Sequence, residues 1–343
     1  MGFGFMISYL LMIPLLVSFL TVVFLMPLWI RKAKSIGLVW EDMNKIKSDK
    51  IAGSGGMIVL LAFCLSVLVY IAYRVFSIGA KNGYLVEIFA LLIIAIFMGF
   101  IGFVDDLFGW KHGGLSMNSR LILTLMGSIP LMAINAGKSL VDIPLLGIID
   151  LGLIYPLFFI PLGVVATTTT FNLLAGFNGL EAGQGDILFS GFALVAYMTG
   201  NPWLAVVCLC LVLALLGFLV FNRFPAKVFP GDIMTYVIGG LIASVCIVGN
   251  FERIAIFFYI PYILEVFLKL RGNLKKHSFG KPLSNGSLDL VYDRIYSLNH
   301  LAIYSMKKLG IKPTEKKAVI LLWSFQFVVI LIGFFIFRKS LFI

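Results

Sequence analysis

The stretch YLVEIFALLIIAIFMGFIGFVDD, residues 84–106, decides the fold class. No charged residue interrupts it between Glu87 and Asp105, and about 20 predominantly apolar residues suffice for a helix to cross a bilayer. Similar runs recur along the 343 residues, of which 61% are hydrophobic and 13% charged. With a mean hydropathy of +1.05, this composition excludes a water-soluble globular protein. The chain is predicted to be a polytopic membrane protein.

Polar and Gly/Pro clusters divide the chain into about ten predicted transmembrane helices, which makes the expected fold all-α. The expected spans are residues 7–30, 55–76, 84–103, 119–136, 152–171, 187–200, 203–221, 233–249, 254–270 and 318–337. A tight turn at Gly200-Asn201-Pro202 separates the sixth span from the seventh. We expect residues 1–343 to form a single integral membrane domain, in which residues 271–317 are a long cytoplasmic loop.

Basic residues are distributed unequally between the two sides of this predicted bundle. The loops 31–54, 104–120, 222–232 and 269–317 contain 21 of the 27 Lys and Arg residues. Loops rich in Lys and Arg face the cytoplasm, so both termini are expected on the other side. Because topology accounts for the net charge of +11, nucleic acid is not an expected partner.

Two adjacent carboxylates, Asp105 and Asp106, end the span quoted above. A carboxylate at the centre of a bilayer costs roughly 2.5–3.5 kcal/mol, so even near the interface a pair requires cations or a polar cavity. The pair therefore indicates a polar centre, and an ordinary solvated helix end is the alternative.

A glycine-rich stretch, NLLAGFNGLEAGQGD, covers residues 172–186 and contains two asparagines and two acids but no Lys or Arg. Glycine permits close backbone approach to a ligand, and asparagine offers both a donor and an acceptor. These properties suit a nucleobase edge or the surroundings of a metal ion. An ordinary connector between spans is the alternative.

Two further stretches belong to the basic loops. In NRFPAKVFPGD, residues 222–232, Asp232 precedes an apolar run, where helix capping would account for it; capping does not explain why Phe229 stands between prolines near Lys227. In RGNLKKHSFGK, residues 271–281, the cations suit the phosphates of an anionic substrate, with anionic lipid headgroups as the alternative.

Three acids and an amide ringed by cations at a membrane interface favour Mg²⁺-assisted phosphoryl transfer, with Mn²⁺ as an alternative ion. Mg²⁺ takes oxygen ligands and bridges phosphate oxygens, and this chemistry depends mainly on positioning and charge neutralisation. The chain has only three histidines, which argues against a histidine-based zinc site.

The four stretches, in this order and on one predicted face, resemble the polyprenyl-phosphate N-acetylhexosamine-1-phosphate transferases. The string GFNGLEAGQ, residues 176–184, looks like the dolichol-dependent branch of eukaryotes and archaea. The resemblance implies ten transmembrane helices and an active site at the cytoplasmic face. It also implies transfer of N-acetylglucosamine-1-phosphate from UDP-GlcNAc to a dolichyl-type polyprenyl phosphate, with release of UMP, as the first step of lipid-linked glycan assembly for protein N-glycosylation.

The resemblance also implies roles for individual residues. The expected Mg²⁺ ligands are Asn172 and Asp232, and the expected uracil contacts are Asn178 and Phe229. Asp105 and Asp106 match the acidic pair of the family, one of which has been proposed to act as a base on the lipid phosphate. The expected diphosphate and substrate contacts are Arg120, Lys275, Lys276, His277, Glu181, Lys50 and Lys227.

Two departures from the family pattern stand out. Residues 51–56 read IAGSGG where the dolichol branch usually has Pro-Glu-Ser, and Lys275-Lys276-His277 replaces an Arg-His-Arg-like signature.

The alternatives to this function are a relative that uses another UDP-sugar or a bacterial lipid carrier for a muramyl-peptide phosphate, and a secondary transporter. The expected location is the cell membrane of a prokaryote or the endoplasmic reticulum membrane of a eukaryote, where the chain could form a homodimer.

Overall fold

The computed structural model describes residues 9–47, 50–78, 83–143 and 147–341. Within these ranges, seven helical segments are long and apolar enough to cross a membrane. They are α1 (Met12–Ile36), α2 (Gly56–Ile78), α3 (Leu85–His112), the π-helical turn η2 (Tyr155–Phe159) with α6 (Ile160–Leu173), α8 (Pro202–Asn222), α9 (Gly231–Gly249) and α13 (Glu315–Ile336). The prediction of an all-α polytopic membrane protein is confirmed.

The other three expected spans correspond to shorter, broken or more polar helices. They are α4 (Met117–Gly127) with α5 (Ile129–Ala133), α7 (Leu180–Met198), and α10 (Glu252–Phe258) with α11 (Ile260–Arg271). Both breaks come two residues before a proline, Pro130 or Pro261, because proline lacks the N–H that would bond to the carbonyl four residues earlier and its ring clashes with that carbonyl. Seven segments meet the length and composition criteria, so the count of ten spans stays a prediction.

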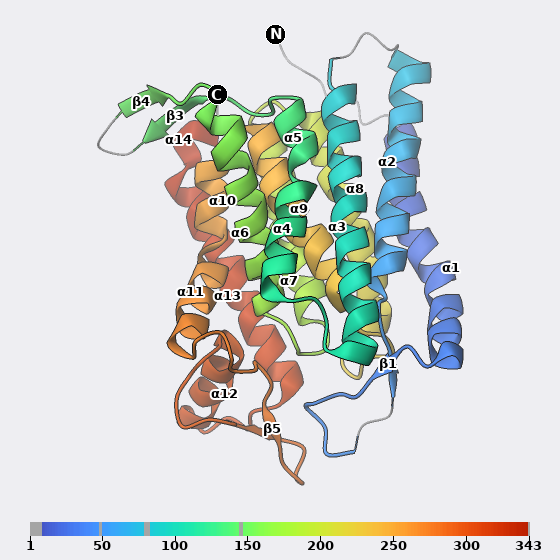
Figure 1. Ribbon diagram of the computed structural model, residues 1–343, viewed down its shortest axis with the longest axis vertical. Coiled ribbons are helices and arrows are strands. Elements are labelled where there is room, and N and C mark those ends of the chain that lie inside the picture. The colour runs from blue at the N-terminus through green and yellow to red at the C-terminus, as the bar shows by residue number, and fades with distance from the viewer. Residues whose placement is uncertain (1–8, 48–49, 79–82, 144–146, 342–343) are drawn as a thin grey trace.

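Helix α9 is the centre of the bundle (Figure 1). Every residue from Ile233 to Ile247 is buried, as expected of a helix that is apolar all round. Glycines bring α9 close to its neighbours: a Cβ atom on Gly102 of α3 would lie 2.5 Å from the carbonyl oxygen of Asp232, and one on Gly239 would lie 2.5 Å from the Cα atom of Thr168 in α6. Small residues are typical where membrane helices pack this tightly.

Short hairpins and helices complete the fold. The antiparallel pairs are β1 (Val39–Trp40) with β2 (Ile51–Ala52), β3 (Leu140–Ile143) with β4 (Gly147–Asp150), and β5 (Lys281–Pro282) with β6 (Leu288–Asp289). The remaining elements are η1 (Tyr9–Leu11), α12 (Leu298–Lys308) and α14 (Arg338–Leu341). Gly286 has a positive φ in the turn between β5 and β6, which fits the preference of Asn-Gly for tight turns.

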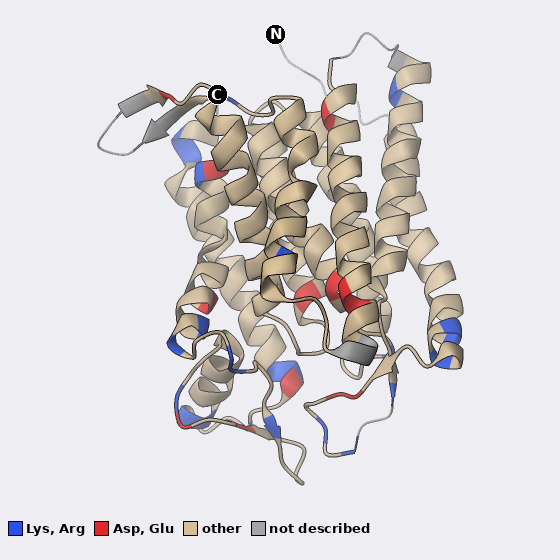
Figure 2. Ribbon diagram, viewed as in Figure 1, with Lys and Arg blue, Asp and Glu red and all other residues tan. Residues whose placement is uncertain are grey.

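Charged residues gather at one end of the bundle, in the loops at the bottom of Figure 2 and the adjoining helix ends. We call it the basic end. The C-terminal end of α3 meets the N-terminal end of α9 there, while α14 lies at the opposite end (Figure 1). Motifs far apart in the sequence therefore share one end of the membrane domain.

Candidate active site

Asp105 and Arg120 form the best-connected ion pair of the site. Asp105 lies near the end of α3 and its side chain is fully buried, whereas the Arg120 side chain of α4 is 29% exposed. The guanidinium approaches both carboxylate oxygens, with Nε 2.7 Å from Oδ2 and Nη2 3.0 Å from Oδ1. The backbone N–H of Leu115 and the hydroxyl of Tyr236 also donate to this carboxylate, so three hydrogen bonds and the ion-pair contact of Arg120 Nε hold Asp105 in place.

Asp106 is engaged differently, because it caps α9 from the neighbouring helix. Its Oδ1 accepts the backbone N–H of Asp232 at 2.7 Å, and its Oδ2 accepts the Ser54 hydroxyl at 2.7 Å. A carboxylate at a helix N-terminus satisfies an unpaired N–H and interacts favourably with the helix dipole. Gly231 leaves room for it, because a Cβ there would lie 2.1 Å from Asp106 Oδ2.

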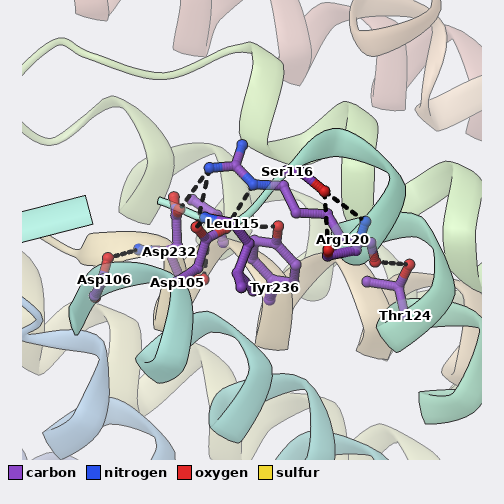
Figure 3. A network of polar contacts seen from close by, with 10 residues as sticks. Asp105, Asp106, Leu115, Ser116, Arg120, Thr124, Asp232 and Tyr236 are labelled. Atoms are coloured by element: carbon purple, nitrogen blue, oxygen red, sulfur yellow. Dashed lines mark hydrogen bonds and ion pairs between the residues drawn. The ribbon is translucent and has the colours of Figure 1, made fainter. Parts of the chain in front are cut away.

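Asp232 lies in the first turn of α9, but it is not the capping residue: the N-cap is Pro230, with no side-chain capping bond. Its side chain is 26% exposed and its Oδ2 lies 3.9 Å from Arg120 Nη2. Figure 3 shows the side chains of Asp232 and Asp105 next to each other on the same side of the Arg120 guanidinium, with Tyr236 close by. Helix capping therefore does not account for Asp232, whose carboxylate faces the accessible side of the cluster.

The charge balance of this cluster suits a divalent cation. Three carboxylates, those of Asp105, Asp106 and Asp232, interact electrostatically, and the Arg120 guanidinium pairs with two of them, Asp105 and Asp232. Like charges so close favour a bound cation. The described residues contain no group of three His, Cys, Asp or Glu side chains that would hold a metal by themselves. Mg²⁺ is commonly held by one or two carboxylates together with substrate phosphates, and Asp232 is placed to provide one.

Asn172, the second expected metal ligand, lies half-buried in the last turns of α6. Thr168, one turn earlier, packs against Gly239 of α9, so Asn172 lies towards the same end of α9 as Asp232. No hydrogen bond or ion pair between described residues joins it to the aspartates. Its role as a ligand stays a prediction.

Phe229 lies in a turn that residues 51–56 hold in place. Its backbone N–H donates to the carbonyl of Ala52 at 2.8 Å, and its carbonyl accepts from the N–H of Gly55 at 2.9 Å. Ala52 and Val228 also form a parallel β-bridge. The half-buried Phe229 ring is therefore carried on a backbone fixed from both sides, next to the Ser54–Asp106 hydrogen bond. The segment 51–56 thus supports the site, although it lacks the glutamate of the family pattern.

Asn178 and Glu181 belong to a second polar cluster. The side chain of Asn178 is buried and its Nδ2 donates to Asp42 Oδ2 at 3.0 Å, while its backbone N–H donates to Glu315 Oε1 at 2.7 Å. The buried Glu181 accepts the backbone N–H of Gly176 at 2.8 Å. The connections of Glu181 are structural, so its predicted substrate contact is not supported by a described interaction.

The basic segment 275–277 packs against a later part of the long loop. Lys275 and His277 are exposed, and the ammonium group of Lys276 lies 4.8 Å from the centre of the Tyr292 ring, a distance that permits cation–π attraction. The buried Lys269 fixes this segment, since it donates to the carbonyl of Lys276 at 2.9 Å. Burial lowers the pKa of His300, so its ring is neutral at pH 7 and adds no cation.

The remaining predicted contacts, Lys50 and Lys227, are exposed side chains in the two segments that pair through the Ala52–Val228 bridge. The structure brings Asp105, Asp106, Asp232 and Arg120 into one cluster, but it does not join Asn178 or the 275–277 segment to them by a described contact.

The sequence reasoning missed several residues: Ser54, Tyr236, Asp42 and Glu315. Tyr236 could have been found, because it lies four residues after Asp232 and so shares a helix face with it. The other three come from distant segments, and their partners cannot be read from local spacing.

The fold and this cluster define a class: a polytopic membrane protein with an acidic, arginine-bridged site at one end of its bundle. Comparison with known proteins makes the class specific, since the model of glycosyl transferase family 4 matches residues 88–250. A protein of Saccharolobus solfataricus, provisionally named UDP-N-acetylglucosamine–dolichyl-phosphate N-acetylglucosaminephosphotransferase, is 32% identical over 92% of this chain and 93% of its own length. The chain belongs to glycosyl transferase family 4.

Two other relatives illustrate the range of the family. A protein of Sulfolobus acidocaldarius with the same provisional name is 32% identical over 85% of this chain and 86% of its own length. The phospho-N-acetylmuramoyl-pentapeptide-transferase of Halalkalibacterium halodurans is 33% identical over 76% of this chain and 81% of its own length. The similarity to the two archaeal proteins thus extends over more of the chain.

Proposed function

We propose that this protein transfers N-acetylglucosamine-1-phosphate from UDP-GlcNAc to a dolichyl-type polyprenyl phosphate, releasing UMP and forming a lipid-linked GlcNAc diphosphate. The observation that carries the proposal is the cluster of Asp105 and Asp232 around Arg120, with Asp106 bonded to the backbone of Asp232, at one end of a membrane bundle that belongs to this family. The names of the two archaeal relatives support this donor and acceptor. Family membership favours neither the transporter alternative nor the muramyl-peptide alternative.

An apolar cavity supports a lipid acceptor. It has a volume of about 930 Å³, lies among α6, α9, α10 and α11, and is lined mostly by apolar side chains such as Leu162, Ile242, Ile263 and Phe267. Its lining along α6 ends at Thr170, two residues before Asn172. A polyprenyl tail placed there would keep its carbon chain out of water and its phosphate near the basic end.

In the proposed reaction, one phosphate group attacks another. An oxygen of the lipid phosphate attacks the β-phosphorus of UDP-GlcNAc, which carries the sugar. The bond between this phosphorus and the oxygen that bridges the two phosphates breaks. UMP departs with the bridging oxygen. A phosphate monoester has a second pKa of about 6 and is largely ionised at pH 7, so a strong base is unnecessary. Arg120 is placed to stabilise phosphate charge, and Asp105 holds the guanidinium in position.

We propose that a magnesium ion, with manganese as an alternative, is held by Asp232 and Asn172 together with the substrate diphosphate. When bound, such an ion supplies charge neutralisation for the phosphates. The residues of the chain contribute the rest: Asp106 fixes the first turn of α9, and with it the position of Asp232.

Each aspartate of the adjacent pair is expected to act by holding its neighbours in place and not as a base. Asp105→Asn and Asp106→Asn should each lower kcat by a factor that stays nearly constant between pH 5.5 and 8, because described donors already occupy both carboxylates. A pH-rate series on each variant measures this. Recovery of either variant as the pH rises through about 6 would indicate a lost base instead.

Phe229 is expected to stack on the base of the nucleotide. Phe229→Ala should raise the KM for UDP-GlcNAc by about 5- to 150-fold, since stacking is worth roughly 1–3 kcal/mol per base, and should leave the KM for the lipid nearly unchanged. Initial-rate kinetics with each substrate varied in turn separate the two constants. Equal changes in both would point to a packing role.

Substrate choice tests the proposed function against its alternative. Purified protein in detergent with Mg²⁺ and dolichyl phosphate should release UMP from UDP-GlcNAc much faster than from UDP-N-acetylmuramoyl-pentapeptide. Faster release from the muramyl donor, with a bacterial polyprenyl phosphate as acceptor, would show that the bacterial alternative is right.

The basic end is proposed to face the cytoplasm, because 21 of the 27 Lys and Arg residues lie in its loops. UDP-sugars would then reach the site from that side. The archaeal and bacterial relatives favour the cell membrane as the location. We also propose that the protein forms a homodimer.

A further inference from the structure

The side-chain amide of Asn178 lies between two carboxylates from distant parts of the chain. Its Nδ2 donates to Asp42 Oδ2 at 3.0 Å and lies 3.5 Å from Glu315 Oε2. Glu315 also accepts the backbone N–H of Asn178 at 2.7 Å. All three residues are buried, with 3–5% of their surface exposed. Buried protein groups, and not solvent, therefore orient the amide.

The chemistry of this environment allows one orientation of the amide. Asp42 forms an ion pair with Lys45, and an ionised carboxylate can only accept hydrogen bonds. The amino group of Asn178 must therefore face Asp42, and its oxygen must point away. No described donor forms a hydrogen bond to Asn178 Oδ1. This oxygen is also absent from the described buried polar atoms that lack a partner, so it is not sealed from solvent. Asn178 thus presents a hydrogen-bond acceptor of fixed direction.

The surrounding segments place this acceptor near the turn that carries Phe229. Lys45 forms an ion pair with Asp42 at 2.8 Å and lies 5.3 Å from the centre of the Phe224 ring. Asn44 Nδ2 donates to the carbonyl of Gly176 at 2.7 Å, which ties the loop of Asp42 to the loop of Asn178. Residues 42–45, 176–178 and the turn from Phe224 to Phe229 therefore form one neighbourhood.

We propose that Asp42 and Glu315 are positioning residues that determine specificity for the nucleobase. Because they hold the Asn178 oxygen outward, the site accepts the N3–H of uracil and rejects cytosine, whose N3 is itself an acceptor. The inference rests on the proposed function, in which Asn178 faces the base. An uncharged amide at either position would accept or donate, so the Asn178 side chain would lose its unique orientation.

Nucleotide affinities test this inference. The affinities of UMP and CMP are measured by isothermal titration calorimetry for the intact purified protein and for Asp42→Asn, Glu315→Gln and Asp289→Asn. The last variant is a matched control, because Asp289 is paired with Lys307 in the long loop. The unmodified protein and the control should prefer UMP by at least about 100-fold, since buried polar groups left unpaired discriminate strongly. Asp42→Asn should reduce the preference at least about tenfold, chiefly through weaker UMP binding, and Glu315→Gln should reduce it in the same direction.

A merely structural role would weaken UMP and CMP binding by equal factors, and equal losses in both variants would overturn the inference. Unchanged preference in both variants would overturn it as well. Thermal unfolding identifies a variant that fails to fold, in which case the other variant decides. If the unmodified protein binds neither UMP nor UDP-GlcNAc, the proposed function itself fails. If the unmodified protein prefers UMP and both variants keep that preference, only the inference about Asp42 and Glu315 fails.

Discussion

Asp232→Asn is expected to lower kcat by about 10³-fold or more while leaving the fold intact. The substitution preserves size and removes only the charge of the carboxylate that is 26% exposed and not engaged in capping α9. Loss of a metal ligand at a phosphoryl-transfer site costs several kcal/mol of barrier lowering. The capping bond from Asp232 N–H to Asp106 is a backbone contact, so the substitution does not remove it.

UMP release measured over a range of Mg²⁺ concentrations tests this prediction, with thermal unfolding as the measure of folding. Asp150→Asn is the matched control and should leave kcat unchanged, because this exposed carboxylate lies on the hairpin at the end of the bundle away from the site (Figure 1). Substantial turnover of Asp232→Asn at ordinary Mg²⁺ concentration would rule out Asp232 as the metal ligand.

Arg120→Met should affect both activity and stability. It removes the cation that pairs with Asp105 and Asp232, so kcat should fall by about 10²- to 10³-fold, as for loss of a group that stabilises charge in the transition state. It also leaves Asp105 buried without its ion pair, and breaking one side of a buried pair costs about 3–5 kcal/mol of unfolding free energy. Arg120→Lys should be intermediate, because lysine keeps the charge and cannot reproduce the two-point contact.

The double variant Arg120→Met/Asp105→Asn separates these two effects. Removing the buried charge should restore most of the lost stability, which thermal unfolding in detergent measures, and activity should stay low. A single variant Arg120→Met as stable as the unmodified protein would contradict the assignment of this pair as the structural centre of the site.

Much of the architecture could be predicted from the sequence because hydrophobicity and charge act locally along the chain. Uninterrupted apolar runs such as residues 88–104 identify the spans, and the positions of Lys and Arg predict which loops share an end. The cluster of Asp105, Arg120 and Asp232 follows from these two patterns, since all three residues lie at span ends on one predicted side. The resemblance then assigns them a common chemistry.

The internal arrangement of the site could not be predicted, because it depends on contacts between segments far apart in the sequence. Asp106 was expected beside Asp105 in the chemistry, but it caps a helix that begins more than a hundred residues later. Asp42 and Glu315 meet at Asn178 from opposite ends of the chain. The breaks before α5 and α11 show that the missing N–H of proline interrupts spans whose hydrophobicity alone predicts continuous helices.

The measurement that tests the central claim most directly uses UDP-GlcNAc labelled with ³²P in the β-phosphate and with ³H in the sugar. Incubated with the purified protein, Mg²⁺ and dolichyl phosphate, this donor should give a lipid that contains both labels in equal proportion and UMP that contains neither, because the bond between the two phosphates breaks. A lipid that contains ³H without ³²P, accompanied by labelled UDP, would show transfer of the sugar alone and would contradict the account.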